Sequence, residues 1–134
     1  MGADVPIVVE LKTPAGWLGV WASDTGPSVW SSTGETLAIT WRDYDLFGRL
    51  AGVRREGPAP KGWPQDVSSL AAWCAQDNGG DYHSLTWYTL AETLAIYNAA
   101  DSWAGTKKSR KFEASDFSYS ADYGEVRVLF AFDN

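Results

Sequence analysis

The sequence contains a single cysteine, Cys74, among its 134 residues. An intramolecular disulfide is therefore excluded, and so is a zinc site built from several cysteines. The N-terminus lacks a basic region followed by an apolar core, so we expect no secretory signal. A reducing compartment suits such a chain, and the cytoplasm is the expected location.

Positive charge and long apolar runs are also scarce. Eleven Lys and Arg stand against 17 Asp and Glu, which gives a formal net charge of −6. General nucleic-acid binding is disfavoured, because displacing counterions requires a positive surface. No apolar run approaches the roughly 20 residues of a membrane span, so no membrane association is expected. A phosphate-binding loop and the G-x-G-x-x-G motif are absent, and no cofactor is predicted.

Tryptophan, by contrast, is abundant. An indole ring fills a core, but it also stacks on flat ligands and donates one hydrogen bond. Eight in so small a chain is more than packing obviously requires, which favours a pocket or an interface that uses some of them. They are Trp17, Trp21, Trp30, Trp41, Trp63, Trp73, Trp87 and Trp103.

Short or alternating apolar segments predict strands at residues 5–11, 16–22 and 36–41. The first two are joined by the turn residues T-P-A-G and form an expected hairpin. The C-terminal segment GEVRVLFAFDN alternates, with apolar residues on both sides, which predicts a strand inside a sheet.

Helical periodicity predicts one helix between Asp43 and Gly52, one that starts at Asp66, and one that starts at Thr89. Thr89 is followed three residues later by Glu92, which is the spacing of a capping box. The order of elements predicts an α+β fold: a mainly antiparallel sheet of about four to five strands, with two to three helices packed on one face. We expect a single domain over residues 1–134.

The only histidine, His83, stands beside Asp81 and Ser84. Adjacent residues on an extended segment point to opposite faces, so we expect that His83 and Ser84 do not pair directly. His83 remains the best candidate for a general acid or base, with Asp81 or Asp77 assisting. The alternative is a half-buried histidine that binds the backbone near a helix start. The aspartates lack the spacing of a calcium loop, so no metal site is predicted.

Four arginines lie within fourteen residues: Arg42, Arg49, Arg54 and Arg55. Guanidinium groups contact phosphate with two parallel hydrogen bonds, and aromatic rings stack on bases. A nucleotide pocket is therefore one interpretation of this group. Pairing of the arginines with local acids at the surface is the other.

Four segments together resemble a family of small, mostly uncharacterised proteins of tailed phages and prophages. They are RDYDLFGRLAGVR (42–54), PKGWPQDVS (60–68), HSLTWYTLAE (83–92) and VRVLFAFDN (126–134), about a third of the chain. Thr86 and Tyr88 stand where the family pattern has Ser and Leu. Segments 13–35 and 99–120 match nothing in that pattern. The resemblance implies a phage origin and action inside a bacterial host cell, and it assigns no activity or catalytic residue.

The hypothesis we draw is a non-catalytic accessory protein that binds a host component, most specifically a sponge for a nucleotide signal of host defence. A homo-oligomer would suit such a protein, because pockets often form between subunits. One alternative is a small phosphodiesterase or nucleotide hydrolase that uses His83 and Asp81. Another is an inhibitor that binds a host protein. The residues expected near the ligand are Arg42, Tyr44, Arg49, Arg54, His83, Ser84 and Trp87.

Overall fold

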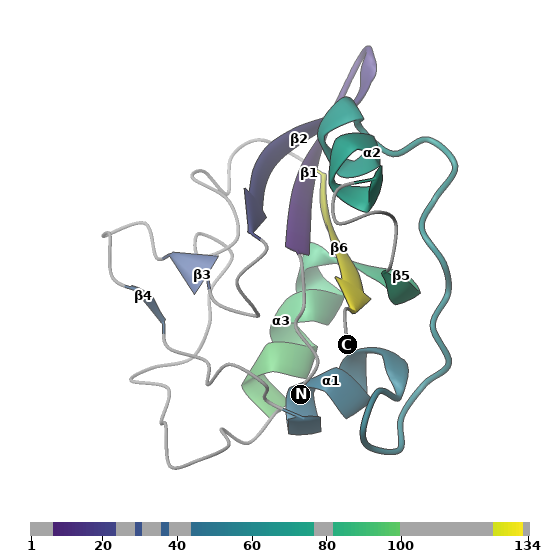
Figure 1. Cartoon of the computed structure of the whole chain (residues 1–134). Coiled ribbons are helices and arrows are strands. Elements are labelled where there is room, and N and C mark those ends of the chain that lie inside the picture. Colours follow the sequence, from purple (N-terminus) through teal and green to yellow (C-terminus); the bar gives the residue numbers. More distant parts are fainter. Residues whose placement is uncertain are drawn as a thin grey trace.

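The computed structural model describes residues 7–23, 29–30, 36–37, 44–76, 82–99 and 125–132. Four strands form one antiparallel sheet in the order β2-β1-β6-β5 (Figure 1). The strands are β1 (Ile7–Thr13), β2 (Gly16–Ser23), β5 (His83–Thr89) and β6 (Val126–Phe132). The helices are α1 (Tyr44–Ala51), α2 (Ser69–Gln76) and α3 (Leu90–Ala99). The predicted α+β fold is confirmed, and none of these helices is long and apolar enough to cross a membrane.

Strand β6 lies inside the sheet, paired with β1 on one side and β5 on the other. All seven of its residues are buried. Val128, Phe130 and Phe132 belong to one apolar cluster, whereas Leu129 belongs to a second cluster on the opposite face. The prediction that this segment is a strand inside the sheet is therefore confirmed, since β6 has a neighbour on each side and both of its faces are covered.

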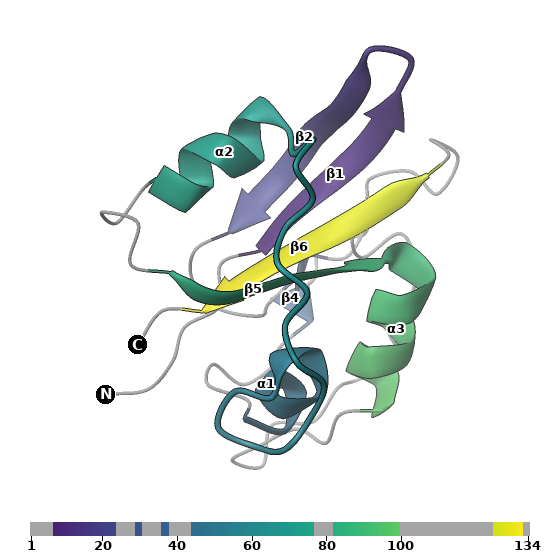
Figure 2. The same cartoon turned by 90° about the vertical axis from the view of Figure 1, so that its right-hand side faces the viewer.

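The helices divide between the two faces of the sheet (Figure 2). Two of them, α1 and α3, share the face that carries the larger apolar cluster. The third, α2, packs on the other face, where Ala71 contacts the cluster of Val8 and Leu129. Close packing there depends on Gly19 of β2, because a Cβ at this position would lie 2.5 Å from the Cβ of Leu70.

Two further strands, β3 (Val29–Trp30) and β4 (Thr36–Leu37), pair with each other in a separate two-stranded sheet. The strand predicted at residues 36–41 is thus described only over its first two residues, and residues 38–41 lie outside the described part. The segment that precedes α3, expected to be extended, is the full strand β5.

The start of α2 differs from the prediction by about one turn of helix. The helix begins at Ser69, because the Ser68 hydroxyl accepts the Ala71 N–H at 3.2 Å and so acts as the N-cap. Asp66, predicted to start this helix, instead accepts a hydrogen bond from Arg127 at 3.2 Å. An acidic residue shortly before an apolar run is typical of a helix N-cap, but here Ser68, two residues after Asp66, is the residue that caps the helix.

The capping box at the start of α3 is confirmed. The Thr89 N–H donates to the Glu92 carboxylate at 2.9 Å, and the Glu92 N–H donates to the Thr89 hydroxyl at 3.2 Å. The hydrogen bond from the Thr89 backbone is the main cause that lowers the pKa of Glu92 from its ordinary value. The ionised carboxylate is therefore the form that stabilises the helix start.

We expect Glu92→Ala to lower the free energy of unfolding by about 0.5–1 kcal/mol at pH 7, because the Thr89 N–H loses its acceptor. A carboxylate with a lowered folded-state pKa stabilises the fold above its unfolded pKa, and this contribution is lost as the pH falls through the folded value. The difference between the two proteins should therefore shrink at acidic pH. Urea unfolding at several pH values measures it. Glu92→Gln, which keeps an acceptor but no charge, is the control, and a pH-independent difference would contradict the expectation.

The segment between α1 and α2 crosses the sheet on the side of β5 (Figure 2). The Gly62 N–H donates to the Leu85 carbonyl at 2.7 Å, and the Lys61 N–H donates to the Thr86 hydroxyl at 3.3 Å. The Trp63 indole donates to the Phe130 carbonyl at 2.8 Å. The first of these bonds satisfies a backbone carbonyl of the edge strand β5, which such a strand would otherwise present to other chains. The other two fasten the segment to the Thr86 side chain and to the internal strand β6.

Candidate functional site

Helix α1 ends where the chain folds back on itself. Gly52 adopts a positive φ of 69°, and its N–H donates to the Gly48 carbonyl at 2.9 Å. The returning chain then passes so close that a Cβ on Gly57 would lie 1.7 Å from the Gly48 oxygen. Glycine at these positions therefore allows residues 54–56 to lie directly beside the helix.

Two guanidinium groups lie against the ring of Tyr44 at this turn. The Cζ of Arg54 is 5.5 Å from the ring centroid, and that of Arg55 is 5.9 Å away. One Arg55 Nη donates to the Arg54 carbonyl at 2.9 Å, which holds the pair together. An open depression is lined by Gly52, Arg54, Arg55, Glu56 and Gly57. The depression is thus lined by two exposed arginines and one exposed glutamate, and both guanidiniums also lie against the ring of Tyr44.

The other two of the four clustered arginines, Arg42 and Arg49, differ from this pair. Arg49 lies one turn after Asp45 and donates to its carboxylate at 3.0 Å. For Arg49, the interpretation as a surface ion pair with a local acid is the one that holds. Arg42 lies outside the described residues. Arg54 and Arg55 form no ion pair with any carboxylate in the described part of the chain.

The prediction that His83 and Ser84 point to opposite faces is wrong. The Nδ1 of His83 lies 2.9 Å from the Ser84 hydroxyl oxygen. His83 pairs with Phe132 and Thr86 pairs with Phe130, so β5 carries one extra residue between them. Ser84 adopts a positive φ of 54° in this bulge. A β-bulge redirects a side chain, and alternation of faces therefore fails at this position.

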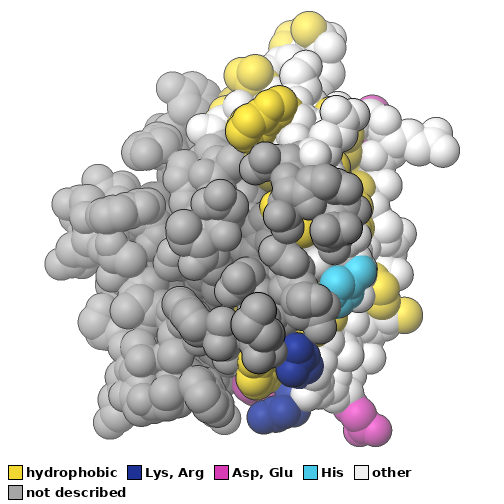
Figure 3. Space-filling model, viewed as in Figure 1, with side chains coloured by type: hydrophobic (Ala, Val, Ile, Leu, Met, Phe, Trp, Pro, Cys, Tyr) yellow, Lys and Arg dark blue, Asp and Glu magenta, His cyan; other side chains and the backbone are white. Residues whose placement is uncertain are grey.

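The candidate residues form a connected row on one face of the sheet. Ring centroids are 5.6 Å apart for Tyr44 and Phe47, and 5.4 Å apart for Phe47 and Phe132. The next step, from Phe132 to the imidazole of His83, is 6.3 Å. The histidine and basic side chains also appear on the same face of the molecule in Figure 3. Packed aromatic rings thus join the arginine pair to His83.

Trp87, in contrast, lies on the opposite face. It packs with the cluster of Val8 and Leu129, and its ring contacts the Lys61 ammonium at 4.7 Å. The guanidinium of Arg127 is 5.9 Å from the same ring. Of the predicted ligand residues, Tyr44 and Arg54 thus come together, His83 and Ser84 form a second pair, and Trp87 joins neither.

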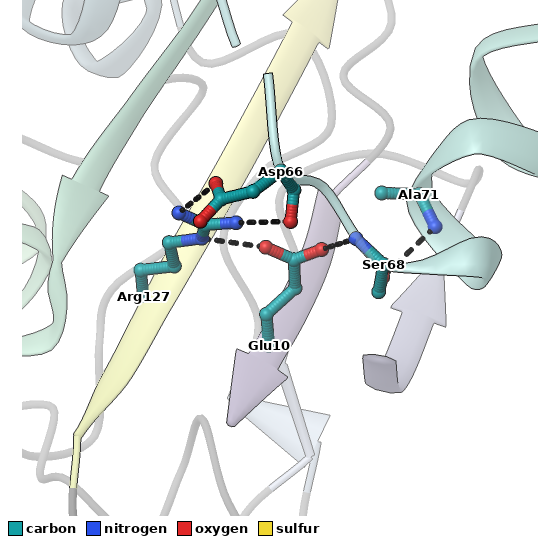
Figure 4. Close-up of polar contacts among 5 residues, drawn as sticks. All are labelled: Glu10, Asp66, Ser68, Ala71 and Arg127. Atoms are coloured by element: carbon teal, nitrogen blue, oxygen red, sulfur yellow. Dashed lines mark hydrogen bonds and ion pairs between the residues drawn. The ribbon is translucent and has the colours of Figure 1, made fainter. Parts of the chain in front are cut away.

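The most buried charges of the described residues were not predicted as a group (Figure 4). The Arg127 Nε donates to the Glu10 carboxylate at 2.6 Å, and the side chains are 5% and 0% exposed. Glu10 also accepts the Ser68 N–H at 2.6 Å, and Arg127 lies 3.9 Å from the centroid of Trp17. Burial of Arg127 could have been predicted from the sequence of β6, because this arginine stands between apolar residues in a strand whose two faces are both apolar.

The 7–132 region, so far as the structure describes it, holds no group of three or more His, Cys, Asp and Glu side chains placed to bind a metal ion. Asp77 and Asp81, proposed to assist His83, lie outside the described residues. Comparison with models of protein families, with curated proteins and with solved structures found no match.

Proposed function

We propose that this chain is a binding protein for a small anionic ligand of the nucleotide type, which it holds intact. The observation that carries the proposal is the pair of guanidiniums, at 5.5 and 5.9 Å from the ring of Tyr44, on the rim of an open depression. Guanidinium forks match the geometry of phosphate oxygens, and a tyrosine edge or face accommodates a base.

The charge environment supports the same ligand class. The chain carries a formal net charge of −6, so two adjacent exposed arginines at one turn form a local exception. An anion gains most where cations are held in place before it arrives, because little side-chain freedom is then lost on binding. The contact with Tyr44 and the hydrogen bond from Arg55 to the Arg54 carbonyl supply that preorganisation.

The biological setting that we propose follows from the resemblance to phage and prophage proteins. The chain would act in the bacterial host cytoplasm, as a sponge that sequesters a nucleotide signal of host defence and does no chemistry on that nucleotide. A homo-oligomer would suit this role, because pockets often form between subunits. Heat release of the bound ligand tests the non-catalytic part: recovery of the intact nucleotide supports the sponge, and recovery of a cleaved product overturns it.

A second candidate function is an inhibitor of a host protein. The observation that favours it is Trp73 on α2, which is 65% exposed although large aromatic side chains are costly to leave in water. Exposed indoles are enriched at the centre of protein interfaces. A pull-down from host lysate with the wild type and Trp73→Ala tests this candidate, which requires a partner that the variant does not capture.

We expect the double variant Arg54→Ala/Arg55→Ala to bind nucleotides about 100-fold more weakly than the wild type, because each charge-assisted hydrogen bond contributes about 1.5–3 kcal/mol. The probes are linear mononucleotides, cyclic mononucleotides and cyclic dinucleotides, without divalent metal. Calorimetric titration gives the affinity, after a thermal-shift screen selects the probe.

Arg49→Ala is the matched control for this experiment. It removes an arginine of the same turn region that is already neutralised by Asp45. We expect less than a threefold change in affinity for this variant. Equal losses in the control and the double variant, or no binding of any probe by the wild type, would contradict the proposed site.

A further inference from the structure

Ser84 has a backbone conformation that serine rarely adopts. Its φ of 54° lies in the left-handed region, where a side chain costs roughly 1–2 kcal/mol. Such conformations persist only where the surrounding structure imposes them, and they concentrate at functional sites. Here the strand pairing imposes it: His83 is held opposite Phe132 and Thr86 opposite Phe130, so the extra residue between them must bend out of the ladder.

The bend brings together a hydroxyl and an imidazole, the nucleophile and the base of nucleophilic catalysis. The Ser84 hydroxyl lies 2.9 Å from the Nδ1 of His83, within the distance at which a base takes a proton from a nucleophile. The imidazole is itself supported by the ring of Phe132, at 6.3 Å between centroids. Both side chains are half-buried, so a substrate can reach them while part of the surrounding water is excluded.

We propose that Ser84 is a covalent nucleophile activated by His83, and that the pair hydrolyses an activated carboxylic ester. In the first step the Ser84 oxygen forms a bond to the acyl carbon, and the hydroxyl proton passes to Nδ1 of His83. The bond from the acyl carbon to the leaving oxygen breaks, and His83 returns the proton to that oxygen. Water then attacks the Ser84 ester in the same way, which releases the acid and restores the hydroxyl.

This inference is independent of the proposed anion site, because it depends on neither Arg54 nor Arg55. It requires only that the neutral imidazole accepts the hydroxyl proton, which is general base catalysis of the kind that contributes about 10²–10⁴-fold. A strained turn that presents a serine to a histidine also recurs in hydrolases of unrelated sequence, where the strain exposes the hydroxyl.

The test is covalent labelling of the full chain with a fluorophosphonate probe. Attack forms a bond from the Ser84 oxygen to phosphorus and breaks the phosphorus–fluorine bond, so fluoride leaves and the proton passes to His83 and then to solvent. Peptide mass mapping locates the adduct. We expect a single adduct on Ser84, formed about 100-fold faster than any adduct on Ser69, an exposed serine of α2. Release of p-nitrophenol from its acetate ester should follow the same variants.

Two variants separate chemistry from folding. His83→Ala should lower the labelling rate of Ser84 about 100-fold. Ser84→Gly should abolish it and leave the melting temperature equal or higher, because glycine adopts a positive φ without cost. Equal rates at Ser84 and Ser69, an adduct at another residue, or undiminished labelling of His83→Ala would each overturn the proposal.

Discussion

Arg127→Ala is expected to lower the free energy of unfolding by about 3–5 kcal/mol, which is the cost of leaving the partner of a buried ion pair uncompensated. Glu10 is fully buried, so its carboxylate cannot turn to solvent when the guanidinium is removed. The loss extends beyond charge, because Arg127 also stacks on Trp17 and donates to both the side chain and the carbonyl of Asp66. Urea unfolding, followed by tryptophan fluorescence, measures the difference.

Two controls determine whether burial is the reason. Lys12 and Glu125 form an ion pair at 3.7 Å with side chains that are 57% and 63% exposed, and Lys12→Ala should cost less than about 1 kcal/mol. The double variant Glu10→Gln/Arg127→Met should be more stable than Arg127→Ala, since no buried charge remains unpaired. A loss below about 1 kcal/mol for Arg127→Ala would contradict the expectation that an unpaired Glu10 carboxylate is costly in this interior.

The parts of the fold that the sequence predicted are those that depend on neighbours in the chain. The capping box of Thr89 and Glu92 requires residues three apart, and both hydrogen bonds are present. Gly52 ends α1 for a reason that is equally local, its positive φ of 69°. The C-terminal strand was predicted as internal because apolar residues on both sides of a strand require cover on both faces.

The parts that could not be predicted depend on pairing between distant segments. Glu10 and Arg127 are 117 residues apart, and the sequence of neither segment indicates that the two pair. The bulge at Ser84 follows from the register between β5 and β6, which a period of two in one strand does not reveal. The sequence predicted two to three helices on one face of the sheet: α1 and α3 share that face, whereas α2 packs on the other, against Val8 and Leu129.

The candidate site shows the same division. Tyr44 and Arg54 flank one short helix, and the glycines that fold the chain back were visible in the sequence, so their meeting was predictable. Trp87 is separated from His83 by only four positions, yet it lies on the opposite face of the sheet. The three expected ligand residues of this strand, His83, Ser84 and Trp87, are therefore divided between its two faces.

Phe132→Ala is expected to cost about 3–5 kcal/mol, because it removes a fully buried ring and leaves a cavity. The ring packs between Phe47 of α1, at 5.4 Å, and the imidazole of His83, at 6.3 Å. The cavity should therefore loosen His83 as well as the core. We expect the fluorophosphonate labelling rate of Ser84 to fall at least tenfold in this variant, since general base catalysis requires the imidazole to be held in place.

Phe130→Ala is the matched control for this effect, because Phe130 is equally buried but packs against Tyr88 and Tyr97. It should destabilise the protein by a similar amount and leave the labelling rate of Ser84 within about threefold of the wild type at temperatures where both variants are folded. Phe132→Leu, which keeps most of the volume, should cost less than Phe132→Ala and retain most of the reactivity. If both alanine variants lowered the rate equally, general loss of stability would explain the effect. A loss confined to Phe132 would show that the end of β6 holds the histidine in position for chemistry on β5.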